Sequence, residues 1–347
     1  MTVPGIDWPR LAAWMAAQVP SAGEPLRASL ISGGKSNLTY LVEASERPVV
    51  LRRPPLGHVL PTAHDMRREW RVISALADTP VPVPPALAFC ADEDVLGAPF
   101  YVMGHVAGTA VREKEELGGL PPERARRLAE RLAEVLAAIH DVDYRQAGLA
   151  DFGRPEGYLA RQLQRWEQQW ERSKTADLPE YDRLVARLRA RMPATSANTL
   201  VHGDYRLDNT LVRLAAAEPP EIMAVVDWEM STLGDPLADL GLTLTYWHDP
   251  GDDERASLPV AGDVTLAPGF LNAAEFAAHY AKVSGRDIGD LGFYVAFGNF
   301  KLAVIVEGIH ARFRQGKTVG EGFDGIGAAV PTLIARAHRM LDQEAPS

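Results

Sequence analysis

The sequence is poor in cysteine: Cys90 is the single one among 347 residues, which excludes an intrachain disulfide. It lies in an apolar, proline-bounded stretch, where a buried thiol is expected. The N-terminus has no basic segment followed by an unbroken apolar core, and no unbroken apolar run approaches the roughly twenty residues that cross a bilayer. We therefore expect a cytoplasmic protein with no membrane partner.

Positive charge is scarce as well. Lysine and arginine number 36 against 46 aspartates and glutamates, which gives a formal net charge of −10. Basic pairs such as Arg67 and Arg68 alternate with acids and apolar residues at helical spacing, a pattern typical of solvated helix faces. Because nucleic-acid binding depends on clustered lysine and arginine, no nucleic-acid partner is expected.

Regular structure is expected in two parts. Strand-like segments dominate the chain up to residue 104, and amphipathic helical patterns dominate the rest. The clearest helical patterns lie at Pro121–His140, from about Gly157, and at Phe276–Val283, Tyr294–Gly308 and Ile326–Leu341. Strands followed by helices predict an α+β fold with an N-terminal lobe at residues 1–104 and a larger C-terminal lobe at residues 105–347.

The most informative motif is VHGDYRLDNTLV, followed after a short connector by MAVVDWEMSTLGDPLAD. Gly203 permits a tight bend, so Asp204 is expected on a loop, with Asn209 five positions later. The segment from Thr210 to Asp227 is predicted to form a β-hairpin with a long turn. Its return strand is expected to deliver Asp227 beside Asn209.

These residue types suit phosphoryl transfer. That reaction needs a carboxylate to orient and deprotonate the attacking hydroxyl, and hard oxygen ligands for Mg²⁺. A rival interpretation is that His202, Asp204 and Asp227 bind a hydrolytic metal directly. The chain has no HxxxH, HExxH or paired-histidine pattern to support that site. We therefore favour a kinase.

The order and spacing resemble the aminoglycoside phosphotransferase and choline kinase superfamily, relatives of protein kinases that carry HGD where protein kinases carry HRD. DWEMSTLGDPLADLG, together with DFGRPEGYLARQLQRW further upstream, is most similar to the kinase domains associated with acyl-CoA dehydrogenases. The resemblance covers most of the chain. It implies a bilobal, protein-kinase-like fold that binds ATP between a small β-sheet lobe and a mainly helical lobe.

The resemblance also implies residue roles. Asp204 corresponds to the catalytic base, and Asn209 and Asp227 correspond to the ligands of Mg²⁺. His202 corresponds to a residue that orients the loop by hydrogen bonding. Asp235, which precedes a proline, is predicted to cap a helix, and Asp239 one turn later is expected to support the loop.

A glycine-bearing hairpin in the first lobe is a candidate phosphate site. The segment SGGKSN places Gly33, Gly34, Lys35 and Ser36 between two strand-like pieces. Exposed backbone N–H groups of such a loop bind anions, although Gly-Gly is also favoured in plain hairpin turns. We assign these four residues to the phosphates of ATP.

Arg52 is a departure from the resemblance. In kinases a lysine on the third strand binds the nucleotide phosphates and pairs with a helix glutamate. Here VVLRRPP places Arg52 at that position, with Glu69 as its predicted partner, and Lys35 or Arg53 could take over the charge. Lysine and arginine are not interchangeable, but arginine can still bind phosphate, and does so through two donors, so Arg52 is kept as the phosphate-binding candidate.

The segment APFYVMGHVAG is an apolar strand that loses its pattern at Gly104. By resemblance it is the connector whose backbone binds the nucleotide base. Met103 is then expected at the back of the base pocket, and Gly104, His105 and Val106 supply the backbone donors and acceptors. ATP and GTP both remain open, because selectivity depends on backbone geometry.

The acceptor is the least constrained part of the prediction. The resemblance suggests a hydroxylated acyl compound, which could be a CoA thioester. The acidic stretch from Asp249 to Glu254, beside Tyr246 and Trp247, could instead attract an aminoglycoside or a choline-like amine, or be a solvated loop. A further alternative is a nucleotide-binding pseudokinase scaffold, which the replacement of lysine by Arg52 favours. The sequence gives no indication of oligomeric state.

Overall fold

The structure is a computed structural model that describes residues 3–33, 37–56, 65–194, 197–215, 218–258, 262–317, 323 and 325–343. The chain forms two compact units. The N-terminal unit comprises Met1–Thr109, Thr210–Arg213 and Met223–Ser231, and the C-terminal unit comprises the remainder. The N-terminal unit therefore includes two short segments from far along the chain, in addition to the expected residues 1–104.

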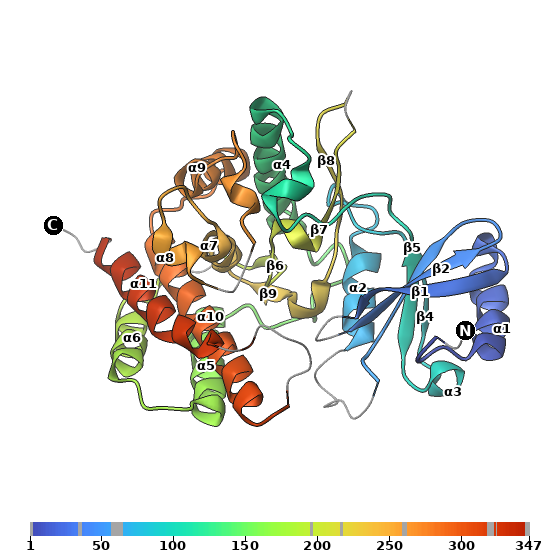
Figure 1. The fold of residues 1–347 in the computed structure, drawn as a ribbon, viewed down its shortest axis with the longest axis horizontal. Coiled ribbons are helices and arrows are strands. Elements are labelled where there is room, and N and C mark those ends of the chain that lie inside the picture. Colours follow the sequence, from blue (N-terminus) through green and yellow to red (C-terminus); the bar gives the residue numbers. More distant parts are fainter. Residues whose placement is uncertain are drawn as a thin grey trace. The chain divides into compact units, whose positions relative to one another are not determined.

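The N-terminal unit is built on an antiparallel sheet of five strands in the order β1-β2-β3-β5-β4 (Figure 1). The strands are β1 (Pro25–Gly33), β2 (Leu38–Ala44), β3 (Val49–Arg53), β4 (Ala86–Cys90) and β5 (Phe100–Gly104). The helices are α1 (Trp8–Gln18), η1 (Pro20–Ala22), α2 (Met66–Ala75), α3 (Glu93–Leu96) and η4 (Trp228–Met230).

Alternation along β5 explains how the sheet is covered on both faces. Phe100 and Val102 belong to the core cluster that contains Leu11 and Met15 of α1. Tyr101 points to the opposite face, because successive side chains of a strand alternate. There its ring lies 6.1 Å from the ring of Trp70 in α2. Helix α1 therefore covers one face of the sheet, and helix α2 covers the other.

The predicted hairpin after Asn209 is confirmed. Strand β7 (Thr210–Arg213) pairs with β8 (Glu221–Val225) in a two-stranded sheet. Val212 forms a further antiparallel bridge with Thr109. Two residues after β8 the chain reaches Asp227, so the hairpin returns this carboxylate to the N-terminal unit.

The C-terminal unit is mainly helical, which confirms the α+β class. Its α-helices are α4 (Pro122–His140), α5 (Tyr158–Ser173), α6 (Pro179–Ala190), α7 (Pro236–Tyr246), α8 (Asp253–Ala256), α9 (Ala273–Ser284), α10 (Leu291–Arg314) and α11 (Ala329–Gln343). Its 3₁₀ helices are η2 (Lys114–Leu117), η3 (Leu207–Asn209), η5 (Val264–Leu266) and η6 (Ile326–Ala328), and β6 (Thr199–Val201) pairs with β9 (Thr232–Gly234). The five helices predicted from periodicity lie at α4, α5, α9, α10 and α11.

Helices α7 and α10 cross at very short range. A Cβ atom added at Gly241 of α7 would lie 2.4 Å from the backbone carbon and oxygen of Tyr294 in α10. A Cβ atom at Gly298 of α10 would lie 2.4 Å from Thr245 Oγ1. Only glycine permits this distance between the two backbones. The close crossing brings α10 next to the helix that supports the HGD motif.

Helix α10 is also the one helix, in the part of the chain that the structure describes, with the length and composition of a membrane span. No unbroken apolar run occurs there, because Gly298, Asn299 and Lys301 interrupt it. Its apolar window is 72% buried inside the protein, as in the core helix of a globular unit. We therefore interpret α10 as the central helix of the C-terminal unit.

Candidate active site

Arg52 joins two carboxylates in the N-terminal unit. Its Nε lies 2.9 Å from Glu69 Oε2, and its Nη2 donates to Asp227 Oδ1 at 2.5 Å. The Arg52 side chain is 11% exposed. The structure thus pairs Arg52 with Glu69 as the sequence suggested, and adds Asp227 as a second partner. Arginine can contact both because its guanidinium presents donors in a rigid fork.

The electrostatics of this group follow from burial. Burial alone would lower the pKa of Arg52, but the carboxylates of Glu69 and Asp227 raise it overall, so the guanidinium stays charged. Burial raises the pKa of Glu69, and the charge of Arg52 opposes that shift. Tyr101 also donates its hydroxyl to Glu69 Oε2 at 3.1 Å.

Asp227 is held in an unusual conformation. Its φ of 64° makes it the single non-glycine residue with positive φ among the described residues. Aspartate tolerates the left-handed region better than most side chains, and such outliers gather at functional sites. In the DWE sequence, this turn places Glu229 on the adjacent η4.

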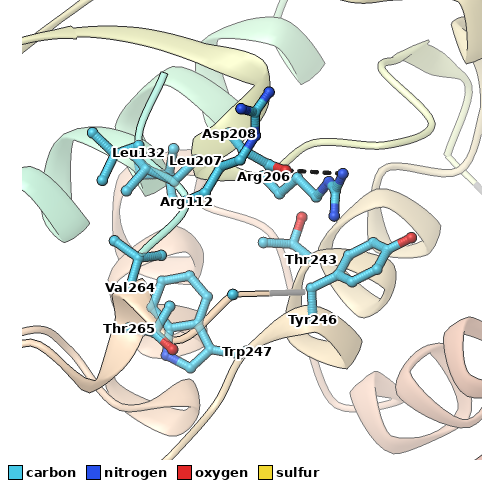
Figure 2. Close-up of a pocket in the computed structure, with 12 residues that line it drawn as sticks. Arg112, Leu132, Arg206, Leu207, Asp208, Thr243, Tyr246, Trp247, Val264 and Thr265 are labelled. Carbon is cyan, nitrogen blue, oxygen red and sulfur yellow. Dashed lines mark ion pairs between the residues drawn. The ribbon is translucent and has the colours of Figure 1, made fainter. Parts of the chain in front are cut away.

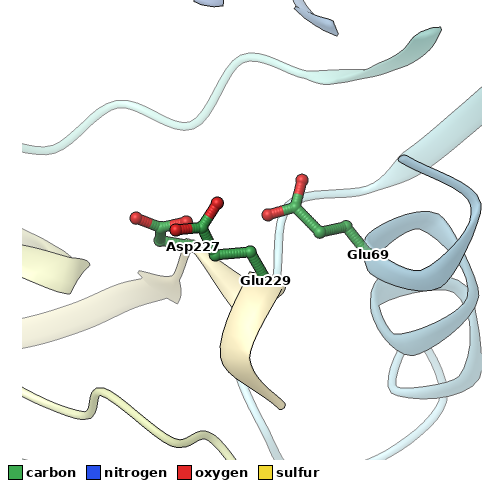
Figure 3. Close-up of side chains that lie close together, drawn as sticks. All are labelled: Glu69, Asp227 and Glu229. Carbon is green, nitrogen blue, oxygen red and sulfur yellow. The ribbon is translucent and has the colours of Figure 1, made fainter. Parts of the chain in front are cut away.

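Three carboxylates gather here. Ligand oxygens of Glu69, Asp227 and Glu229 all lie within 4.8 Å of one another, and Figure 3 shows the three carboxylates close together. Glu69 comes from α2, and the other two come from the segment after β8. Asn37 Nδ2 donates to Glu229 Oε2 at 3.1 Å.

The composition of this cluster fits Mg²⁺, which prefers hard oxygen ligands. Within the described part of the chain, the buried Glu69 Oε1 and Asn37 Oδ1 have no hydrogen-bond partner. Oxygens of this kind are suited to a cation or its bound water. Asp227 and Glu229 are partly exposed, so an ion could reach them from solvent.

The structure describes some, but not all, of the other residues predicted to bind the nucleotide. Gly33 ends β1, whereas Gly34, Lys35 and Ser36 lie outside the described residues. Met103 is buried in β5, and the strand ends at Gly104 as the pattern predicted. His105 is exposed, and Val106 is half-buried in the coil that follows.

The HGD loop, residues 202–209, lies in the C-terminal unit. Asn209 Nδ2 donates to the backbone oxygen of Asp204 at 2.8 Å and to Asp204 Oδ2 at 3.0 Å. The structure thus brings together the predicted base and one predicted metal ligand. Asp204 retains a 27% exposed side chain, so its carboxylate remains accessible to a substrate. Gly203, with φ +86°, makes the bend that the sequence predicted.

Asp239 supports this loop from α7. Its carboxylate accepts hydrogen bonds from His202 N at 2.6 Å and Gly203 N at 2.7 Å. His140 Nε2 lies 3.3 Å from the same carboxylate, and its Nδ1 lies 2.7 Å from the Tyr280 hydroxyl. Burial lowers the pKa of His140, with Asp239 opposing the shift. The supporting role expected for Asp239 therefore has a geometric basis.

Asp235 caps α7 as predicted. Its Oδ1 accepts a hydrogen bond from Leu237 N at 2.9 Å, and Pro236 opens the helix. Tyr294 of α10 donates its hydroxyl to the other oxygen, Oδ2, at 2.7 Å.

A pocket of about 40 Å³ adjoins the HGD loop (Figure 2). Its apolar lining comes from Val111, Leu132, Leu207, Trp247 and Val264, and its charged lining comes from Arg112, Arg206 and Asp208.

Arg206 connects the pocket with Asp204. Its Nη2 lies 2.9 Å from Asp208 Oδ2, and its Nε lies 3.6 Å from Asp204 Oδ2. Its guanidinium carbon lies 4.8 Å from the centre of the Tyr246 ring. Burial, followed by the charge of Asp204, raises the pKa of Tyr246. Tyr246 therefore stays a neutral hydroxyl beside the predicted base.

The acidic stretch after Trp247 has structural partners. Both oxygens of Asp252 lie 2.7 Å from Arg336, and Asp252 also caps α8. Glu254 pairs with Arg336 and Arg339. Asp249 accepts a hydrogen bond from the backbone of Ala273. Much of this negative charge is therefore used to hold the fold.

Sequence reasoning missed Arg206 and Asp208 as site residues, and it left open whether Glu229 lies near the metal or the acceptor. Arg206 and Asp208 lie between Asp204 and Asn209 in the motif, and this position could have marked them as residues of the site. Glu229 offered its spacing of two residues from Asp227. Tyr246 was considered only for its place near the acidic stretch, and its proximity to Asp204 depends on tertiary structure.

Comparisons with known proteins identify the family. The profile of the phosphotransferase enzyme family, APH, matches residues 27–284. Acyl-CoA dehydrogenase family member 10 of Mus musculus is 36% identical over 299 residues, which cover 84% of this chain and 27% of that protein. The chain thus spans well under half the length of the curated relatives it matches.

Solved structures agree. A Ralstonia eutropha protein, provisionally named an aminoglycoside phosphotransferase, is 35% identical with a TM-score of 0.82 and coverage of 97% and 98% of the two chains. A thermostable aminoglycoside phosphotransferase mutant, solved in ternary complex with AMP-PNP and hygromycin B, shares the fold alone: 15% identity, a TM-score of 0.61 and coverage of 97% and 99%. This chain therefore belongs to the phosphotransferase enzyme family and has its kinase-like fold.

Proposed function

We propose that this protein is a Mg²⁺-dependent small-molecule kinase that transfers the γ-phosphoryl group of ATP to a substrate hydroxyl. The observation that carries the proposal is the pairing of Asp204 with Asn209. One amide fixes both the backbone and the carboxylate of Asp204, yet leaves that carboxylate partly exposed. A general base needs this combination of fixed orientation and access to the proton it removes.

In the proposed reaction, Asp204 accepts the proton of the acceptor hydroxyl as that oxygen bonds to the γ-phosphorus and the bond to the β–γ bridging oxygen breaks. Asn209 and Asp227 are the proposed metal ligands, and Glu229 is a third candidate. When bound, Mg²⁺ neutralises phosphate charge. Arg52, kept cationic by its two carboxylates, is the proposed phosphate-binding side chain.

ATP is proposed as the phosphoryl donor because a fold neighbour was captured with AMP-PNP. The adenine ring of ATP is proposed to contact the backbone from Gly104 to Val106, next to Met103. MgGTP is the alternative donor, and the assay below includes it.

A hydroxylated acyl compound is the proposed acceptor class. The pocket beside Asp204 is narrow and largely apolar, and it contains two arginines. An acyl chain with a carboxyl or thioester carbonyl matches this lining better than a polycationic amino sugar does. The similarity to acyl-CoA dehydrogenase family members points in the same direction.

Two alternatives remain under test. A choline-like or aminoglycoside acceptor would need free negative charge, and Asp252 and Glu254 are paired with Arg336. A pseudokinase scaffold would not need both a base and metal ligands. Arg52 is its best support, but Arg52 here makes the Glu69 contact that lysine makes in kinases.

The test is ADP production from MgATP, with MgGTP in parallel, across hydroxy acids, hydroxyacyl-CoAs, choline and aminoglycosides. We expect acceptor-dependent turnover that is lost in Asp204→Ala and Asp227→Ala. Asp78→Ala, at an exposed position, is the matched control and should behave as wild type. Nucleotide binding without turnover in wild type would favour the scaffold. Turnover that survives Asp204→Ala would contradict the assignment of the base.

A further inference from the structure

Lys301 reaches the HGD loop from the central helix α10. Its Nζ donates to the backbone oxygen of Gly203 at 2.8 Å. Gly298 lies one turn before it on the same helix and contacts α7, and Tyr294 lies two turns before it and donates its hydroxyl to Asp235. The close α7–α10 crossing at Gly298 therefore places this face of α10 within reach of the loop.

The ammonium group occupies an unfavourable environment. Burial lowers the pKa of Lys301, while the carboxylates of Asp204 and Asp239 act in the opposite direction. The Nζ atom also lies 5.7 Å from the centre of the Trp166 ring, a distance at which a cation is attracted to the ring face. The Lys301 side chain is half-buried in a mainly apolar helix, where a lysine is uncommon, so its contact with Gly203 calls for a role.

Gly203 is held by opposite charges at its two ends. The carboxylate of Asp239 accepts the N–H of Gly203, and the ammonium of Lys301 binds its carbonyl. The residue between these contacts has a left-handed φ of +86° and directly precedes Asp204. A shift of this residue would move the carboxylate of Asp204.

We propose that Lys301 is a positioning residue, whose hydrogen bond to the Gly203 carbonyl fixes the bend that aims Asp204. The functional part of this inference rests on the proposed kinase reaction. The structural part, anchoring of the loop, does not. The two parts can therefore be measured separately in the same variants.

The test compares Lys301→Met with Lys282→Met, a matched exposed lysine on α9. Hydrogen exchange of the segment 199–206 is measured without substrate. We expect exchange to rise about tenfold or more in Lys301→Met, as for loss of a charged hydrogen bond, and to be unchanged in Lys282→Met. Lys301→Arg, which retains a cationic donor, should recover protection. Lys301→Ala, which also removes the donor, replaces the methionine variant if that variant does not fold.

Turnover is measured in the same proteins. We expect Lys301→Met to lower kcat about tenfold while KM for the nucleotide stays within about twofold. The anchoring would be overturned by unchanged hydrogen exchange of the segment 199–206 in Lys301→Met. It would also be overturned if that segment exchanged as fast in Lys301→Arg as in Lys301→Met. Loosened exchange with wild-type kcat would overturn the positioning of Asp204. If wild type transfers no phosphoryl group, the proposed function fails, and the exchange data still decide the anchoring.

Discussion

Arg52 and Asp227 form an ion pair in which Nη2 lies 2.5 Å from Oδ1, although 175 positions separate them in the sequence. The same guanidinium contacts the buried Glu69. Removing it with Arg52→Met would leave Glu69 buried without its cation. Because an uncompensated buried charge is costly, we expect a loss of about 3–5 kcal/mol in the free energy of unfolding, measured by urea denaturation.

Arg27→Met in β1 is the control for that measurement, because Arg27 pairs with Glu43 on an exposed strand surface and should change stability little. Arg52→Lys keeps the charge but lacks the fork that reaches both carboxylates. Its free energy of unfolding should therefore lie between those of wild type and Arg52→Met. A stable Arg52→Met protein would contradict this expectation and would show that Glu69 tolerates burial without the guanidinium.

Asp204→Asn keeps the shape of the side chain and an oxygen for the amide of Asn209. It removes the proposed base. We expect kcat to fall about 10²–10⁴-fold with little change in nucleotide affinity, measured by steady-state kinetics and calorimetry. A parallel loss of nucleotide binding would instead indicate that Asp204 supports the fold of the loop.

Glu229→Gln tests the acidic cluster. It removes one of three carboxylates that lie within 4.8 Å of one another. We expect the Mg²⁺ concentration for half-maximal activity to rise about tenfold, measured by titration after chelator treatment. Glu221→Gln, on the exposed start of β8, should leave the titration unchanged. An identical Mg²⁺ requirement in both variants would exclude Glu229 from the metal site.

His140 gives a prediction for pH. Its folded pKa lies below the unfolded value of 6.5 because the ring is buried, so the unfolded chain binds the extra proton. Its contribution to stability is therefore present above about pH 6.5 and is lost as the pH falls below it. The stability difference between wild type and His140→Gln should shrink from pH 7.5 to 5.5, measured by urea denaturation. A difference that grows toward acid pH would mean that His140 is charged in the fold.

The α7–α10 crossing predicts opposite effects for two glycine substitutions. Gly241→Ala places a methyl group 2.4 Å from the Tyr294 backbone and should destabilise the protein by about 1–3 kcal/mol. Gly308→Ala on α10 meets no atom closer than 3.8 Å and should be neutral or stabilising by about 0.5–1 kcal/mol. Thermal unfolding of the two variants measures both. Equal melting temperatures would mean that the helices can move apart.

Local patterns predicted much of this fold. The apolar repeat in Pro121–His140 predicts α4 to within one residue, and the Asp235–Pro236 pair predicts the start of α7. These features depend on neighbours in sequence, which is why they could be read from it.

Long-range contacts could not be read in this way. His140 meets Asp239 across 99 positions, and Lys301 meets Gly203 across 98. The apolar neighbours of Lys301 in α10 indicate that the helix is buried, but they do not identify Gly203 as the group that Lys301 contacts. The acidic residue Asp252 was a possible ligand site from sequence, but its partner Arg336 lies 84 positions away. Partner choice of this kind is set by tertiary packing.

The segment that carries Asp227 belongs to the N-terminal unit although it follows the whole HGD loop in sequence. An expressed fragment ending at residue 109 would therefore lack Asp227. Of the two carboxylates that Arg52 binds, such a fragment would retain only Glu69. Chimeras that exchange this unit between relatives must transplant all three pieces of chain together. For the same reason, a recombination event with a single junction could not transfer the complete N-terminal unit from one gene to another.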